Sequence, residues 1–149
     1  MNYELTLTTH EKRTAELFGD IDTIELHTVP IETLEAMKNH YLVSLSYLGE
    51  LKTTRGNALN ESKTALKIIL TEKKIEYLKD LTGSDKARIA TLYAERDCET
   101  EIKGIAILEN EYKEVSNRYS VCDTIIRSLT QTISVVKNEI QSQQFIKGK

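Results

Sequence analysis

The strongest constraint on the fold is an apolar repeat in the C-terminal part of the chain. Its positions follow strict alternating steps of three and four residues: Ile105, Leu108, Tyr112, Val115, Tyr119, Cys122, Ile126, Leu129, Ile133, Val136 and Ile140. This period is typical of a helix that packs along one face against other helices. At about 1.5 Å per residue, the repeat extends over roughly 54 Å. We therefore predict a coiled-coil-like helix that must be covered along much of its length.

The rest of the chain predicts further long helices and an all-α fold. Pro30 suits the first position of a helix, and Thr82-Gly83-Ser84-Asp85 predicts a helix end followed by a new N-cap. Gly56-Asn57 between them is either a break or a bend. No proline follows, so one helix is predicted from about Lys86 to about Gln143. The expected architecture is a coiled-coil-like helical hairpin or bundle.

The first 29 residues read differently from the helical domain predicted for residues 30–149. Apolar side chains alternate here with a period of two, at Tyr3, Leu5 and Leu7 and again at Ile24 and Leu26. This alternation predicts a small two-stranded β element, with a short helix from Thr9 to Phe18 that ends at Gly19. The alternative is an extended N-terminal arm that becomes ordered only on a partner.

The sequence contains no pattern typical of an active site, a metal site or a cofactor site. It has no glycine-rich phosphate loop, the three histidines are scattered, and Cys98 and Cys122 match neither a disulfide framework nor a zinc motif. No run of about 18 apolar residues predicts a membrane span. We expect a cytoplasmic protein that is not an enzyme, binds no cofactor and does not contact a membrane.

Basic residues concentrate between residues 52 and 88, although the formal net charge of the chain is −3. On a helix, Lys63, Lys67 and Lys74 fall within about 40° of one another. A basic stripe with a few flat side chains is enough for sequence-independent binding of a single strand. The candidate nucleic-acid-binding residues are Lys52, Arg55, Lys63, Lys67, Lys73, Lys74, Tyr77 and Lys79. Alternatively, these lysines only extend along a packed apolar surface, since Leu59, Leu66 and Leu70 lie close to the same face.

The apolar stripe widens over its last heptads, where Val121, Ile125 and Val135 lie beside the repeat. A wide stripe rich in β-branched residues favours assemblies larger than dimers. We therefore expect a homo-oligomer whose contacts include Cys122, Ile126, Leu129, Ile133, Val136 and Ile140. The alternative is that this helix packs only within its own chain, as part of a three-helix bundle.

Two patches of the sequence resemble one family. The first is the tail, from Ser128-Leu129 through Ile133 and Val136-Lys137-Asn138 to Phe145-Ile146-Lys147-Gly148. The second comprises Lys73-Lys74, Tyr77-Leu78 and Thr82-Gly83. Together they are similar to the UvsY-type recombination mediators of large tailed phages, which close with a lysine, an isoleucine and a final aromatic before Gly.

The resemblance implies a non-enzymatic oligomer that binds single-stranded DNA in the host cell cytoplasm. Such a protein helps a RecA-like recombinase to displace single-strand-binding protein. By the same resemblance, Lys73 and Lys74 are DNA contacts and Phe145 joins the assembly contacts. The alternative function is a coiled-coil structural or scaffolding protein of a phage, with no nucleic-acid role.

Overall fold

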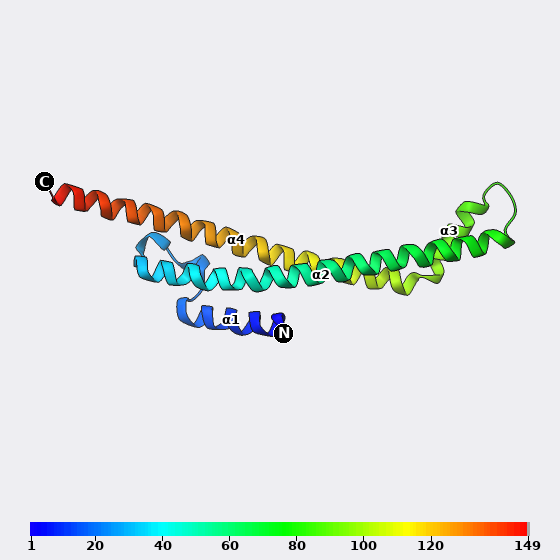
Figure 1. The fold of residues 1–149 in the computed structure, drawn as a ribbon, viewed down its shortest axis with the longest axis horizontal. Coiled ribbons are helices and arrows are strands. Elements are labelled where there is room, and N and C mark those ends of the chain that lie inside the picture. The colour runs from blue at the N-terminus through cyan, green and yellow to red at the C-terminus, as the bar shows by residue number, and fades with distance from the viewer. Residues whose placement is uncertain (149) are drawn as a thin grey trace. The chain divides into compact units, whose positions relative to one another are not determined.

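The structure, a computed structural model, describes residues 1–148 and confirms the all-α prediction. Its four α-helices are α1 (Tyr3–Phe18), α2 (Ile31–Asp80), α3 (Lys86–Asp97) and α4 (Glu99–Lys147), as Figure 1 shows. Two short 3-10 turns, η1 (Ile21–Thr23) and η2 (Leu26–Thr28), connect α1 to α2. The chain divides into two compact units. Unit 1 comprises Met1–Leu51 together with the chain from Val115 onward, and unit 2 comprises Lys52–Glu114.

The predicted β element is wrong, because residues 1–148 contain no strand. Tyr3–Phe18 is a helix whose first turn is capped by Asn2, where the side-chain oxygen accepts from the Leu5 amide. Tyr3 and Leu7 lie four residues apart, on one helix face that packs into the core, while Leu5 is 65% exposed. The exposed Leu5 produced the apparent period of two. The predicted end of this helix is confirmed, with Gly19 at a φ of 74°.

The second predicted strand is an irregular segment with the two 3-10 turns. Its apolar side chains pack onto a buried cluster formed by Leu34, Met37, Leu129 and Ile133. The side chains that pack onto this cluster are those of Ile21, Ile24, Leu26 and Val29. This segment therefore covers one end of unit 1 and does not pair as a strand.

Helix α2 begins directly after Pro30 and runs for 50 residues without a break. Gly56-Asn57 lies within it, so this pair neither ends nor restarts the helix. The helix end predicted at Thr82-Gly83 is confirmed, since α2 stops at Asp80 and Gly83 has a φ of 101°. The next helix starts at Lys86, after Asp85.

The single helix predicted from Lys86 to Gln143 is interrupted once, at Cys98. There φ and ψ are −104° and 19°, and the Cys98 amide donates to both the Ala94 and Glu95 carbonyls. The interruption lasts one residue, because the Cys98 carbonyl already accepts from Ile102 in the next turn. Ala90, Ala94 and Cys98 lie four residues apart and are buried, so α3 packs through small side chains up to this interruption.

The core of unit 1 is built by α1 and by parts of α2 and α4. Leu7, Leu48 and Leu51 pack with Val115, and Leu34 and Met37 pack at the other end of the unit. Four of the predicted oligomerisation residues belong to these two clusters: Cys122, Ile126, Leu129 and Ile133. The protein's own helices cover these four residues, an arrangement that fits the alternative in which α4 packs within its own chain.

Two helical glycines provide a matched test of packing in unit 2. A Cβ at Gly56 would lie 3.2 Å from Cε2 of Tyr112, whereas a Cβ at Gly104 meets no heavy atom within 4 Å. Replacing a helical Gly with Ala stabilises by roughly 0.5–1 kcal/mol where space allows. We therefore expect Gly104→Ala to raise Tm by about 1–4 °C. Gly56→Ala should lower Tm or leave it unchanged, because Tyr112 must shift.

Thermal unfolding followed by circular dichroism, at one protein concentration, compares the two variants. An equal rise in Tm for both would show that Tyr112 yields without cost, and that Gly56 is not required for the close packing.

Candidate functional site

The basic residues in the first part of the α2 stripe are engaged by acids of α4. Arg55 donates to the Glu111 carboxylate, and the Lys63 ammonium lies 2.7 Å from a Glu109 oxygen. Both pairs lie within unit 2 and are partly exposed, so each contributes little to stability. Lys52 is half-buried. The ion pairs of Arg55 and Lys63 neutralise part of the positive charge of the predicted binding stripe.

The lysines further along α2 remain available. Among residues 1–148, Lys67, Lys74 and Lys79 form no ion pair; Lys67 and Lys79 are exposed and Lys74 is half-buried. Lys67 and Lys74 are seven residues apart, which places them on the same side of α2. Within the predicted binding stripe, the positive charge available to an anionic ligand therefore lies in the C-terminal half of α2.

Tyr77 is fixed by a carboxylate of α3. Its hydroxyl donates to Asp97, and the Lys73 ammonium lies 4.0 Å from the same carboxylate. The hydrogen bond to Asp97 raises the pKa of Tyr77, and the bond from Tyr77 lowers the pKa of Asp97. The phenol therefore stays a donor and the carboxylate stays ionised, so the ring of Tyr77 is held in place.

Tyr93 and Arg96 were missed by the sequence analysis. The Tyr93 ring packs edge-on against Tyr77 with centroids 5.3 Å apart, and the guanidinium carbon of Arg96 lies 5.0 Å from the Tyr93 centroid. The three-residue spacing of Tyr93 and Arg96 on one helix was the only available signal. Their proximity to Tyr77 depends on how α3 packs against α2, which no local pattern shows.

The remaining predicted oligomerisation residues lie toward the end of α4. Val136 is half-buried, and Ile140 and Phe145 are exposed, as are the neighbouring Val135 and Ile146. Phe145 and Ile146 are 67% and 72% exposed. The apolar surface that unit 1 leaves accessible on α4 is therefore concentrated in this terminal segment.

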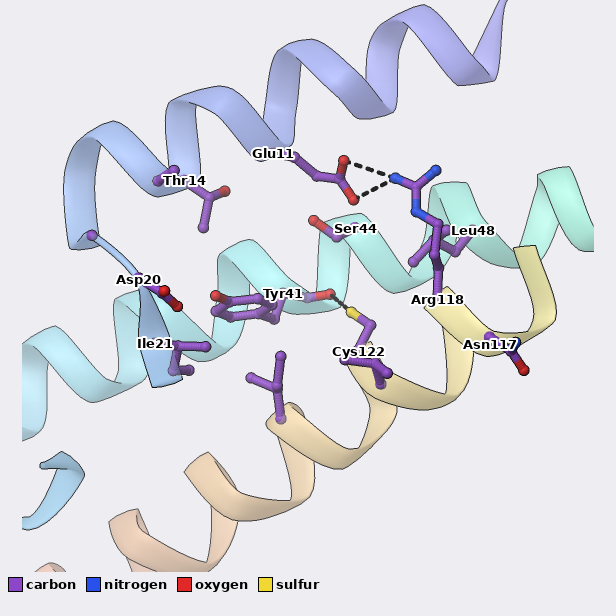
Figure 2. A pocket seen from close by; sticks show the side chains of 14 residues that line it. Glu11, Thr14, Asp20, Ile21, Tyr41, Ser44, Leu48, Asn117, Arg118 and Cys122 are labelled. Carbon is purple, nitrogen blue, oxygen red and sulfur yellow. Dashed lines mark hydrogen bonds and ion pairs between the residues drawn. The ribbon is translucent and has the colours of Figure 1, made fainter. Parts of the chain in front are cut away.

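Unit 1 also contains a cavity of about 600 Å³ between α1, α2 and α4, which Figure 2 shows. Most of its lining is apolar, including Ile21 and Leu48. The Nη2 of Arg118 donates to both oxygens of Glu11 at 2.8 Å, which links α4 to α1 beside the cavity. No local sequence pattern predicts this cavity, because its lining comes from three separate segments.

Cys122 is the one thiol that lines this cavity. Its Sγ donates to the Tyr41 carbonyl at 3.3 Å, and burial raises its pKa to about 11. The thiol is therefore protonated at neutral pH, whereas nucleophilic catalysis requires a thiolate. Cys122 acts here as a small core residue.

Two of the scattered histidines meet between α1 and α2. The rings of His10 and His40 stack with centroids 5.2 Å apart, and the edge of Phe18 contacts His40. The Nε2–H of His10 donates to the His40 carbonyl at 2.8 Å, and the Thr14 hydroxyl lies 3.4 Å from Nδ1 of His40. The pair therefore helps to hold α1 against α2.

This pair makes the packing of α1 sensitive to acid. Burial, then His10, then the charge of Arg13 lower the pKa of His40 below its ordinary value of 6.5. The folded state therefore binds this proton less readily than the unfolded state. The resulting stability is complete above about pH 6.5 and is lost as pH falls through the lower pKa of the folded state. We expect a lower Tm at pH 5.5 than at pH 7.5, measured by circular dichroism.

The matched variants are His40→Gln, which should weaken this pH dependence, and His27→Gln, which should preserve it because the His27 side chain is 75% exposed. An unchanged pH dependence in His40→Gln would assign the acid sensitivity to other groups.

Residues 1–148 contain no cluster of three or more His, Cys, Asp or Glu side chains that could hold a metal ion. Within the same range, no helix combines the length and the apolar character required to span a bilayer.

The fold and the two surfaces define an all-α protein of long packed helices, with a lysine-bearing helix in unit 2 and an exposed apolar helix end in unit 1. Comparison of the chain with family models, curated proteins and solved structures finds no match.

Proposed function

We propose that this protein binds single-stranded DNA as a homo-oligomer, through the C-terminal half of α2. The observation that carries the proposal is the set of lysines at Lys67, Lys74 and Lys79, on the same helix as Tyr77, whose ring packs against Tyr93. Cations along a helix neutralise phosphates, and nearby aromatic rings accept unpaired bases. This combination fits a flexible single strand better than a duplex, whose bases are already stacked.

Assembly makes a weak site effective. One protomer offers only a few phosphate contacts, but several linked copies bind the same strand with a raised effective concentration. The proposed assembly contacts are Val136, Ile140 and Phe145, together with the adjoining Val135 and Ile146, because these apolar side chains lie beyond the buried clusters of unit 1.

The resemblance to UvsY-type mediators extends this proposal to a biological role. The bound strand is held for a RecA-like recombinase, which then replaces single-strand-binding protein. The support for this role is the resemblance of the basic Tyr77 region and of the tail to that family.

A second function is favoured by one specific observation. Arg55 and Lys63 are paired with Glu111 and Glu109, as expected if the basic residues of α2 serve helix packing. A structural or scaffolding protein without a nucleic-acid role would use them in this way. The two functions differ in whether the protein binds a single strand.

Fluorescence anisotropy with a labelled oligonucleotide separates them. Binding should be evident at about 50 mM salt and should weaken steeply as salt rises, with a slope of about −0.7 per phosphate contacted. A matched duplex should bind less tightly. Absence of binding at low salt would exclude the DNA-binding function and leave the scaffolding function.

A further inference from the structure

Tyr93 on α3 lies at the centre of a combined aromatic and cationic surface in unit 2. Its side chain is 38% exposed, and the Arg96 side chain beside it is 66% exposed. The Arg96 guanidinium carbon is 5.0 Å from the Tyr93 ring centroid, and Tyr77 supports that ring from α2. An accessible ring next to a cation is the arrangement by which proteins hold unpaired bases.

We propose that Tyr93 is a base-stacking residue for single-stranded DNA, and that Arg96 binds the phosphate next to the stacked base. This inference rests on the proposed function, because the strand reaches Tyr93 by following the lysines of α2. Lys74 lies one helical turn before Tyr77, so a strand bound at Lys74 passes beside the aromatic pair.

The carboxylate of Asp97 at this surface contacts Tyr77 and lies beside two cations. Asp97 accepts from the Tyr77 hydroxyl, lies 4.0 Å from the Lys73 ammonium and lies 3.6 Å from the Arg96 guanidinium. When the Arg96 side chain moves to a phosphate, the Lys73 ammonium remains beside this carboxylate. The same contacts fix Tyr77 against Tyr93, so little ordering is required when a base arrives.

The contact between Arg96 and Tyr93 is weak enough to be exchanged. An exposed cation–π contact favours association by about two- to fivefold. A base stacked on an aromatic side chain contributes about five- to a hundredfold. A base therefore takes the place of the guanidinium on Tyr93, and the long Arg96 side chain turns to the adjoining phosphate. Duplex bases are covered by their neighbours and cannot make this exchange.

The test compares two oligonucleotides of equal length with the full-length protein, one of thymidines and one whose sugars lack bases. Wild type should bind the thymidine strand more tightly. Tyr93→Leu should weaken binding of the thymidine strand by about five- to a hundredfold and change binding of the abasic strand less than about twofold. Tyr93→Phe retains the ring and should bind both strands like wild type. Arg96→Gln should reduce the salt slope by about one unit with either strand.

Each outcome decides the matter. If Tyr93→Leu loses the same affinity for both strands, the ring only supports the fold of unit 2. If it loses no affinity for the thymidine strand, no base stacks on Tyr93. Either result overturns this inference and leaves the proposed function standing. If wild type binds neither strand, the proposed function itself fails. Circular dichroism of each variant checks that α3 remains folded.

Discussion

Reversing charge at Lys67 and Lys74 is expected to abolish binding of single-stranded DNA and to leave the helices intact. Both lysines lie on one side of α2, and neither forms an ion pair within residues 1–148. The Lys67→Glu/Lys74→Glu variant loses two phosphate contacts per protomer and adds two repulsive charges. We expect affinity at about 50 mM salt to fall by more than roughly a hundredfold, and the salt slope to become shallower by about 1.4 per bound protomer.

The chain offers a matched control for this variant. Lys12 and Lys113 are exposed lysines on α1 and α4, and neither belongs to the predicted binding residues. Lys12→Glu/Lys113→Glu changes the net charge by the same amount and should bind nearly as well as wild type. If both double variants lose affinity equally, the total charge of the protein governs binding, and the site on α2 is wrong. Anisotropy titrations at two salt concentrations provide this comparison.

The second large effect separates the core of unit 1 from the proposed assembly contacts. Leu129 is fully buried with Leu34 and Met37, so Leu129→Ala leaves a cavity that costs about 2–5 kcal/mol. Because the stability of a whole domain is about 5–15 kcal/mol, this variant should melt at a much lower temperature. Phe145 and Ile146 are mostly exposed, so Phe145→Asp/Ile146→Asp should retain the folded helices and lose the oligomer.

Circular dichroism and sedimentation distinguish these results. Leu129→Ala should lower Tm, whereas Phe145→Asp/Ile146→Asp should preserve Tm at low concentration and sediment as a smaller species. An oligomer of unchanged mass in the tail variant would show that the assembly contacts lie elsewhere. Ile133 is unsuitable for this test, because it is 8% exposed in the core and a charge there would unfold unit 1.

The long-range period of the sequence predicted most of the helical fold. The apolar repeat of α4 corresponds to its packed face, with Val115 and Cys122 buried. Gly19 and Gly83 marked helix ends because both adopt a positive φ. The signal of a helix end depends only on neighbouring residues, so tertiary packing does not change it. The exposed Leu5 misled the same reasoning, since a short stretch of alternating residues fits a strand and a helix almost equally well.

What covers the α4 repeat could not be predicted from its own residues. From the sequence, residues 1–29 were placed outside the helical domain. Other copies of the chain were expected to cover the apolar repeat of α4. In the structure, Leu7 and Ile21 pack with the buried clusters of unit 1, so this segment contributes to covering Cys122 and Leu129. Tertiary contacts between segments more than 80 residues apart carry no local pattern.

The candidate site was predicted in part, for the same reason. Clustering of lysines on α2 is visible in the sequence, but their ion pairs with Glu109 and Glu111 depend on how α4 packs against α2 in unit 2. Tyr93 and Arg96 come close to Tyr77 only through the packing of α3. The stacked pair of His10 and His40 likewise joins two helices.

One assembly of this chain is expected to bind single-stranded DNA. Native mass spectrometry, with and without a single-stranded oligonucleotide, tests both parts at once. We predict one main species larger than a dimer, whose mass increases by that of a bound oligonucleotide and does not increase with a matched duplex. A monomer that gains no mass from the oligonucleotide would contradict the account.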